Sequence, residues 1–195
     1  MSKSDPSSSK KERIKYLRWV AIIFVVTILV SGVISLGSEA LMSASSIWVA
    51  FLVLLVIVFI GIIFDIIGMA VASADEKPFH SMAARKVAGA AEALSLLRNA
   101  ERVSSVCNDV IGDICGVVSG SAAATITAQI IRNFEFSWPR VVSLVMSALV
   151  AGLTVGGKAV GKTFAVNSST AIVHGVGKIL YSMHHIPELF RKKKK

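Results

Sequence analysis

The sequence predicts an all-α, polytopic membrane protein with four transmembrane helices and amphipathic helices at the membrane interface. Apolar residues make up 54% of the 195 positions, and the mean hydropathy is +0.69. These residues gather in four long runs with few charges, and about 20 such residues cross a bilayer. The formal charge of +9 is concentrated at the two ends and in one internal segment. That distribution indicates membrane topology more than a nucleic-acid surface.

The amino-terminal stretch 1–18 is polar and basic, which predicts a disordered cytoplasmic tail. Trp19–Leu36 follows without a charge and is long enough to span the bilayer as an extra amino-terminal transmembrane helix. A cleaved signal peptide is the alternative, but its apolar core is usually about 7–15 residues long, and Ser38-Glu39-Ala40 is a weak cleavage site. We therefore expect an uncleaved anchor, followed by a short loop over Gly37–Ser46.

The second expected span, Ile47–Ala72, is interrupted by Gly61, Asp65 and Gly68. The two glycines are seven residues apart, so they share one helix face with the aspartate between them. A carboxylate inside a membrane costs about 2.5–3.5 kcal/mol on insertion scales. We therefore expect this face to meet another helix rather than lipid.

Two further segments, Ser81–Arg102 and Ser169–Met183, have apolar residues at helical spacing opposite polar ones. The first is too polar to span and is expected to be one amphipathic helix along the cytoplasmic interface, with a helical hairpin that dips between the spans as the alternative. The chain ends in a basic tail over 184–195, whose lysines would sit on anionic headgroups.

The third expected span, Val103–Ile131, is rich in small residues. Gly112, Gly116 and Gly120 recur every four residues and form a small-xxx-small row. Such a row lets another helix approach closely, within the protomer or across a dimer. The fourth span, Val141–Val155, is short and glycine-rich and continues towards residue 163.

The third span also carries oxygen-bearing side chains. Asn108, Asp109 and Asp113 occupy its first third, and the two carboxylates, four residues apart, point the same way. Cys107 and Cys115 lie about 12 Å apart along the same helix, which excludes a disulfide between them. We interpret both cysteines as small apolar side chains.

Basic residues fix the expected orientation. They cluster at the amino end, in Asp75–Arg102 and at the carboxyl end, whereas the intervening loops hold only Arg132 and Arg140. Four spans with both termini inside place every cluster on the cytoplasmic side. The sequence thus predicts a multi-pass protein of the plasma (inner) membrane with both termini cytoplasmic, in contact with the lipid bilayer and not with nucleic acid.

One motif, Gly156-x4-Gly161-Lys162-Thr163, formally matches a phosphate-binding loop. Such a loop needs a strand before it and a helix after it, whose N–H groups bind the phosphate. A predicted span comes before it here, so we interpret the match as chance. No nucleophile–base pattern supports catalysis, and we expect no enzyme.

Three motifs fall in an order and at a spacing that resemble a known family. They are Phe64-Asp65-Ile66-Ile67-Gly68-Met69-Ala70, Asn99-Ala100-Glu101-Arg102 and Gly157-Lys158-Ala159-Val160-Gly161-Lys162-Thr163-Phe164-Ala165-Val166. They are similar to the patterns F-S-x-x-E-x-A, N-P-E-R and G-E-x-x-P-K-T-x-A of the transmembrane domain of CNNM/CorC magnesium transporters. The resemblance implies a CNNM-like transmembrane domain over 47–183, without the CBS domains that usually follow.

The resemblance also implies a homodimer that holds a dehydrated Mg²⁺, and it suggests a separate cytoplasmic regulatory subunit as a further partner. In the family the ion lies among a serine, asparagines and the glutamate of G-E-x-x-P-K. Asp65 stands at the serine position here, and Lys158 stands at the glutamate position. Asp109 and Asp113 have the spacing of the family asparagines, offset by about two residues. The residues that match in the third motif include Gly157, Lys162 and Thr163.

Two functions follow as alternatives. The first is a divalent-cation (Mg²⁺) transporter or exporter, in which Lys158 snorkels to the interface. Its ion would be held by oxygen ligands, which Mg²⁺ prefers, from Asp65, Asn108, Asp109 and Asp113. The second is a non-transporting accessory or scaffold protein in which the Lys158 ammonium takes the cation's place. A further interpretation of Asp109 is that it lies near the start of its helix, where an acidic side chain is favoured. The direction of the Lys158 side chain discriminates the functions, because a fixed lysine cannot be transported.

Overall fold

The computed structural model describes residues 6–43, 45–134 and 138–192, and within them every regular element is helical. The elements are α1 (Pro6–Ser43), α2 (Ile47–Ser73), α3 (Lys77–Ala84), α4 (Ala90–Arg98), α5 (Ala100–Ser105), the π-helical segment η1 (Val106–Gly112), α6 (Asp113–Phe134), α7 (Pro139–Asn167) and α8 (Ser169–Lys192). Four segments are long and apolar enough to cross a membrane: Leu17–Met42, Ile47–Ser73, Ala100–Asn133 and Pro139–Asn167. The predicted class, an all-α membrane protein with four spans, is confirmed. The interfacial role of the amphipathic segments stays a prediction.

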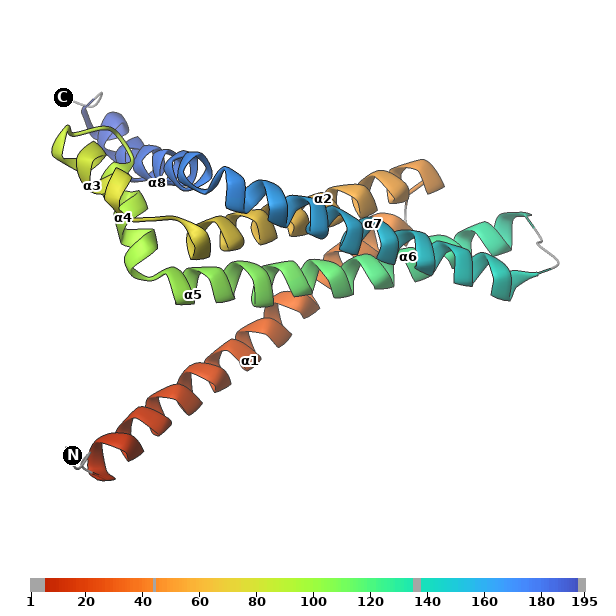
Figure 1. The fold of residues 1–195 in the computed structure, drawn as a ribbon. Coiled ribbons are helices and arrows are strands. Elements are labelled where there is room, and N and C mark those ends of the chain that lie inside the picture. Colours follow the sequence, from red (N-terminus) through yellow and green to blue (C-terminus); the bar gives the residue numbers. More distant parts are fainter. Residues whose placement is uncertain (1–5, 44, 135–137, 193–195) are drawn as a thin grey trace.

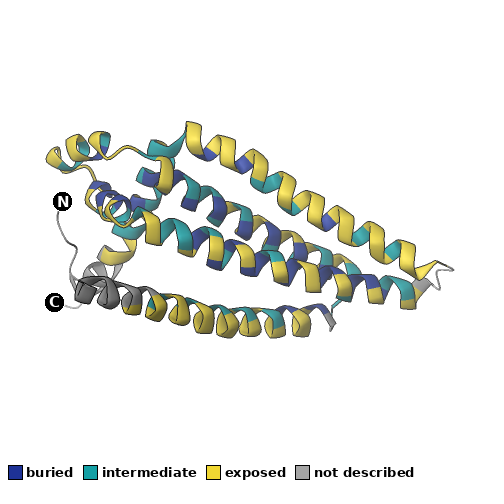
Figure 2. Cartoon of the chain, turned by 60° about the horizontal axis from the view of Figure 1, so that its bottom comes forward, coloured by how far each residue is buried: buried dark blue, intermediate teal, exposed yellow. Residues whose placement is uncertain are grey.

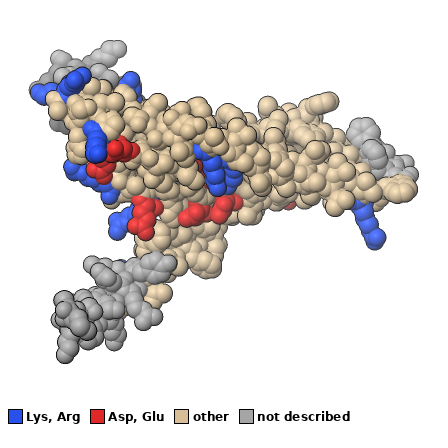
Figure 3. Space-filling model, viewed as in Figure 1, with Lys and Arg blue, Asp and Glu red and all other residues tan. Residues whose placement is uncertain are grey.

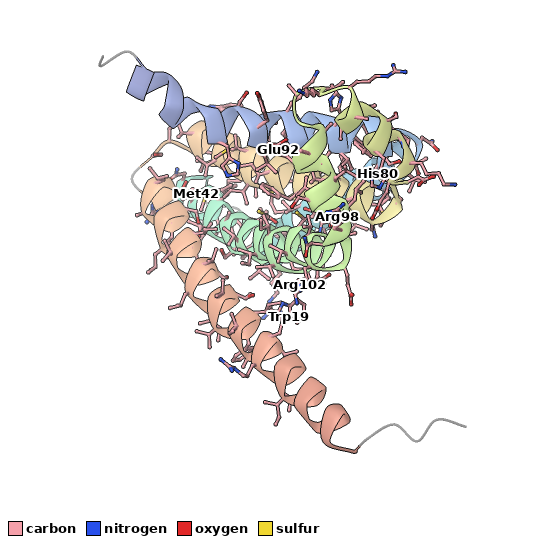
Figure 4. The ribbon with its side chains drawn as sticks, turned by 90° about the vertical axis from the view of Figure 1, so that its left-hand side faces the viewer. Trp19, Met42, His80, Glu92, Arg98 and Arg102 are labelled. Carbon is pink, nitrogen blue, oxygen red and sulfur yellow. The ribbon has the colours of Figure 1, made fainter. Side chains whose placement is uncertain are left out.

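Helices α2, α6 and α7 run side by side, with α6 antiparallel to the other two (Figure 1). Helix α1 packs on this bundle near its own carboxyl end and diverges from it towards the amino terminus. The short helices α3 and α4 lie with α8 at one end of the bundle, and the start of α1 points to the same side. Basic side chains gather at that end in Figure 3. Figure 4 looks onto it and labels polar residues there from α3, α4 and α5: His80, Glu92, Arg98 and Arg102.

The core has two main apolar clusters joined by α2. One lies towards the α1–α2 connection and contains Met42, Ala50, Leu54, Val58, Ala122, Ala123, Ile126 and Val150. The other joins α2 to the short helices and α8, around Phe79, Leu94, Leu97, Ala165 and Val173. The surfaces of α1 and α7 are largely exposed in Figure 2, and their exposed residues are mostly apolar. Lipid is the natural solvent for such a surface.

Helix α1 extends beyond both predicted ends of the first span. It is helical from Pro6, inside the stretch that was expected to be disordered, and it continues to Ser43, so most of the predicted loop over Gly37–Ser46 is wrong. Burial of Ser38 and Met42 against the bundle stabilises this last part. The Gln129 side chain also donates a hydrogen bond to the Met42 carbonyl oxygen at 2.9 Å, which satisfies a helix-end acceptor.

The predicted single helix over Ser81–Arg102 is wrong. The chain forms α3, turns, and starts again as α4 and α5. Lys86 and Gly89 in the turn have φ values of 55° and 83°. Glycine suits position 89 for two reasons: its φ is left-handed, and its backbone lies directly against α8, at Gly177. Parts of the predicted tails and outer loop, residues 1–5, 135–137 and 193–195, lie outside the described residues.

Candidate functional site

The α2 face with Gly61, Asp65 and Gly68 meets η1 and α6, as the seven-residue spacing predicted. A Cβ atom on Gly61 would come within 2.8 Å of the Cys115 Cβ. A Cβ on Gly68 would overlap the Asn108 side chain and lie 2.9 Å from the Cys107 Cβ. The two glycines therefore allow α2 to approach its neighbour closely and bring Asp65 into the interface, where 7% of its side chain is exposed.

Gly68→Ala is expected to lower the free energy of unfolding by about 1–3 kcal/mol, because the added methyl overpacks the interface with Asn108 and Cys107. Gly32→Ala on α1 is the matched control, since a Cβ at Gly32 has no neighbour within 4 Å. Thermal unfolding of both variants in detergent measures the difference. An equal, small effect of the two changes would contradict the close approach at Gly68.

Lys158 on α7 points into this interface. Its Nζ lies 3.5 Å from the Asp65 Oδ1 and 3.8 Å from the Asp113 Oδ1. It also donates a hydrogen bond to the Gly112 carbonyl oxygen at 3.4 Å. The three acceptors come from α2, α6 and the end of η1, so a single ammonium joins three elements of the bundle.

The two ion pairs differ in their surroundings. The side chains of Lys158 and Asp65 are 20% and 7% exposed, whereas that of Asp113 is 71% exposed. Buried charges need their partner, while an exposed pair contributes about 0–1 kcal/mol. The contact between Lys158 and Asp65 is therefore the structural one, and Asp113 borders it from the surface.

The π-helical segment η1 carries two of the predicted site residues. The Asn108 Nδ2 donates to the Ser104 Oγ at 3.2 Å, and the Asn108 Oδ1 is buried beside Gly68 without a hydrogen-bond donor. The Asp109 Oδ2 accepts from the Ser105 Oγ at 2.9 Å, and its residue is exposed. Asp109 thus bonds to the last residue of α5, four positions before it, and does not join Lys158.

The remaining predicted residues lie outside the cluster. Gly157 packs against Ile62 of α2, and Lys162 is exposed one turn beyond Lys158. Sequence reasoning missed two contributors, the Gly112 carbonyl and Ser104. The serine stands four residues before Asn108, a spacing that allows contact in a helix, but nothing in the sequence marks the carbonyl.

The cluster lies nearer one end of the spans. About 26 Å of helix separates Lys158 from the exposed Val141, and about 12 Å separates it from the exposed Val166 at the end near α8. Figure 3 shows a group of acidic and basic side chains partway along an otherwise uncharged surface. The charged residues at this level are within reach of one membrane interface by snorkelling.

The residues present fit poorly around Mg²⁺. Oxygen donors exist, because the Asp65 Oδ2 and the Asn108 Oδ1 are buried without hydrogen-bond partners. The Lys158 ammonium, however, lies directly on the other oxygen of Asp65. In the part of the chain that the structure describes, no three His, Cys, Asp or Glu side chains converge as metal ligands.

The arrangement is therefore a lysine-centred polar cluster between three spans, and its chemistry is charge neutralisation and cross-linking of helices. Cys107 and Cys115, which border the α2 interface, are both free and buried. Comparison with known protein families, with curated proteins and with solved structures finds no match.

Proposed function

We propose that this protein is a non-transporting integral membrane scaffold, whose polar core is closed by Lys158 in the place that a transported cation would take. The observation that carries this proposal is the convergence of the Lys158 Nζ on Asp65, Asp113 and the Gly112 carbonyl. On this proposal the similarity of the three sequence motifs to CNNM/CorC patterns does not extend to ion transport.

Electrostatics favours the ammonium over a divalent ion here. Lys158 already neutralises one of the two carboxylate charges beside it. A second cation of charge +2 at about 4 Å from the ammonium would be repelled by about 8 kcal/mol at an effective dielectric constant of 20. Mg²⁺ also loses its hydration shell reluctantly. Together these costs weaken the binding of Mg²⁺ while the lysine is in place.

Calorimetric titration of the purified full chain with Mg²⁺ tests the proposal. We expect no binding by the wild type and measurable binding by Lys158→Met, because the neutral side chain frees the oxygens of Asp65, Asp113 and Gly112. Mg²⁺ should also raise the melting temperature of Lys158→Met, since a ligand that binds only the folded state stabilises it.

Lys162→Met is the matched control, because it removes a positive charge one turn away on an exposed site. The Lys162→Met variant should show no Mg²⁺ binding in the same titration. Wild-type binding that Asp65→Asn abolishes would overturn the proposal and support the Mg²⁺ transporter alternative. A Lys158→Met variant that folds but does not bind Mg²⁺ would contradict the proposal that Lys158 takes the place of a bound cation.

The proposal has further parts. A scaffold acts by contact, so we propose a second copy of the chain as its partner, and a separate cytoplasmic subunit as a partner for the basic end with α3, α4 and α8. The positive charge at that end supports a cytoplasmic orientation of both termini in the plasma membrane. No catalytic role is assigned.

A further inference from the structure

One membrane-facing side of α6 and α7 is unlike the rest of the apolar surface. A groove of about 200 Å³ lies between the two helices and is lined mainly by small residues: Gly116, Ser119, Gly120, Ala123, Ser147, Val150, Ala151, Thr154 and Val155. A Cβ added to Gly116 or Gly120 would have no neighbour within 4 Å, so no other part of the described chain uses this close-approach surface. Gly112, in contrast, faces Asp65 and Lys158.

Exposed charges of both signs continue the same stripe. Asp113 at the start of α6 and Asp109 in η1 precede Gly116 by three and seven residues, and Lys162 on α7 follows Val155 by seven. Asp109 and Lys162 are exposed, and 71% of the Asp113 side chain is exposed. Lys162 forms no ion pair with any described residue. Such charges on a membrane span find a partner or reach the interface by snorkelling, and an ion pair with a second copy would satisfy Lys162.

Asp109 and Lys162 lie at a similar depth along the bundle. The Asp113 Oδ1 and the Lys158 Nζ are 3.8 Å apart, which sets the level of α6 against α7. Because the helices are antiparallel (Figure 1), Asp109 and Lys162 both lie beyond that level towards α8, Lys162 by about 6 Å along α7. A two-fold axis along the membrane normal keeps every residue at its own depth, so it can bring the Asp109 of one copy to the Lys162 of the other.

We infer that the α6–α7 face, defined by the groove together with Asp109, Asp113 and Lys162, binds the same face of a second copy. Small residues allow the backbones to approach, and the Asp109–Lys162 pairs fix the register. The charges are self-complementary across a two-fold axis, which favours a second copy over a chain of another kind. This inference rests on the proposed scaffold function, for which it names the docking surface.

Subunit counting tests the face. The full chain carries one fluorophore and is reconstituted in phosphatidylcholine vesicles at graded protein density, and photobleaching steps give the dimer fraction. Gly120→Leu is expected to raise the dimer Kd at least about tenfold, because the leucine holds the helices apart. Gly32→Leu on α1 is the matched control, since a Cβ there also has open space, and it should leave the Kd unchanged.

Charge exchange tests the register. Lys162→Glu should raise the dimer Kd about tenfold, and Asp109→Lys added to it in the same chain should restore most of the affinity. Wild-type protein that stays monomeric at every density would overturn the inference and leave lipid as the occupant of the groove. Equal dimerisation of Gly120→Leu and the wild type would also overturn it. Magnesium titration is independent of this readout, so the scaffold proposal and the dimer face fail separately.

Discussion

Replacing Lys158 with methionine is expected to lower the free energy of unfolding by about 3 kcal/mol in the absence of Mg²⁺. The change removes the ammonium but leaves the Asp65 carboxylate almost fully buried. Breaking a buried pair by removing one partner costs about 3–5 kcal/mol, because the remaining charge is uncompensated. We expect a cost at the lower end of this range, since one fifth of the Lys158 side chain is exposed and its Nζ lies 3.5 Å from the Asp65 Oδ1.

The double variant Lys158→Met/Asp65→Asn should recover most of the loss, because it removes the orphaned charge as well. Unfolding in mixed micelles by increasing denaturing detergent gives the free energies of the wild type, both single variants and the double variant. Asp113→Asn should change stability by no more than about 1 kcal/mol, since that carboxylate is 71% exposed. A double variant as unstable as Lys158→Met would mean that packing around the lysine stem, and not charge pairing, holds the cluster.

Much of this architecture follows from one-dimensional patterns. The second span was predicted over Ile47–Ala72 and is α2, Ile47–Ser73, because a long apolar run with one charged residue has few alternatives to a membrane helix. The inward face with Asp65 follows from the seven-residue spacing of its glycines. Both predictions depend only on helix periodicity and on the cost of placing polar groups in lipid.

Other features depend on tertiary contacts and have no sequence signal of their own. Gly112, at the end of the π-helical segment Val106–Gly112, lies beside Asp65 and Lys158, whereas a Cβ on Gly116 or Gly120 would have no neighbour within 4 Å, although all three had been placed on one row. The direction of Lys158 is set by which carboxylates α2 and α6 bring near it. Neither feature changes composition or periodicity enough to be predicted.

The turn between α3 and α4 offers the second large effect. Gly89→Val is expected to cost about 3 kcal/mol of stability, from two sources. The φ of 83° places a side-chain-bearing residue in the left-handed region, which costs about 1–2 kcal/mol. A Cβ there would also meet the backbone of α8, 2.5 Å from the Lys178 nitrogen, and overpacking costs a further 1–3 kcal/mol or so.

Gly89→Val should loosen α4 and α8 more than the rest of the bundle. Helix α8 is held at this point by the contact between Gly89 and Gly177 and by the His174 Nε2, which lies 3.3 Å from the Ala88 carbonyl oxygen. Amide hydrogen exchange should therefore accelerate in α8 and α4 of Gly89→Val more than in α2. Gly175→Val is the matched control on α8, two residues from Gly177, since a Cβ there has no neighbour within 4 Å. If Gly175→Val accelerated exchange in α8 as much as Gly89→Val, the close contact between Gly89 and α8 would not be the cause.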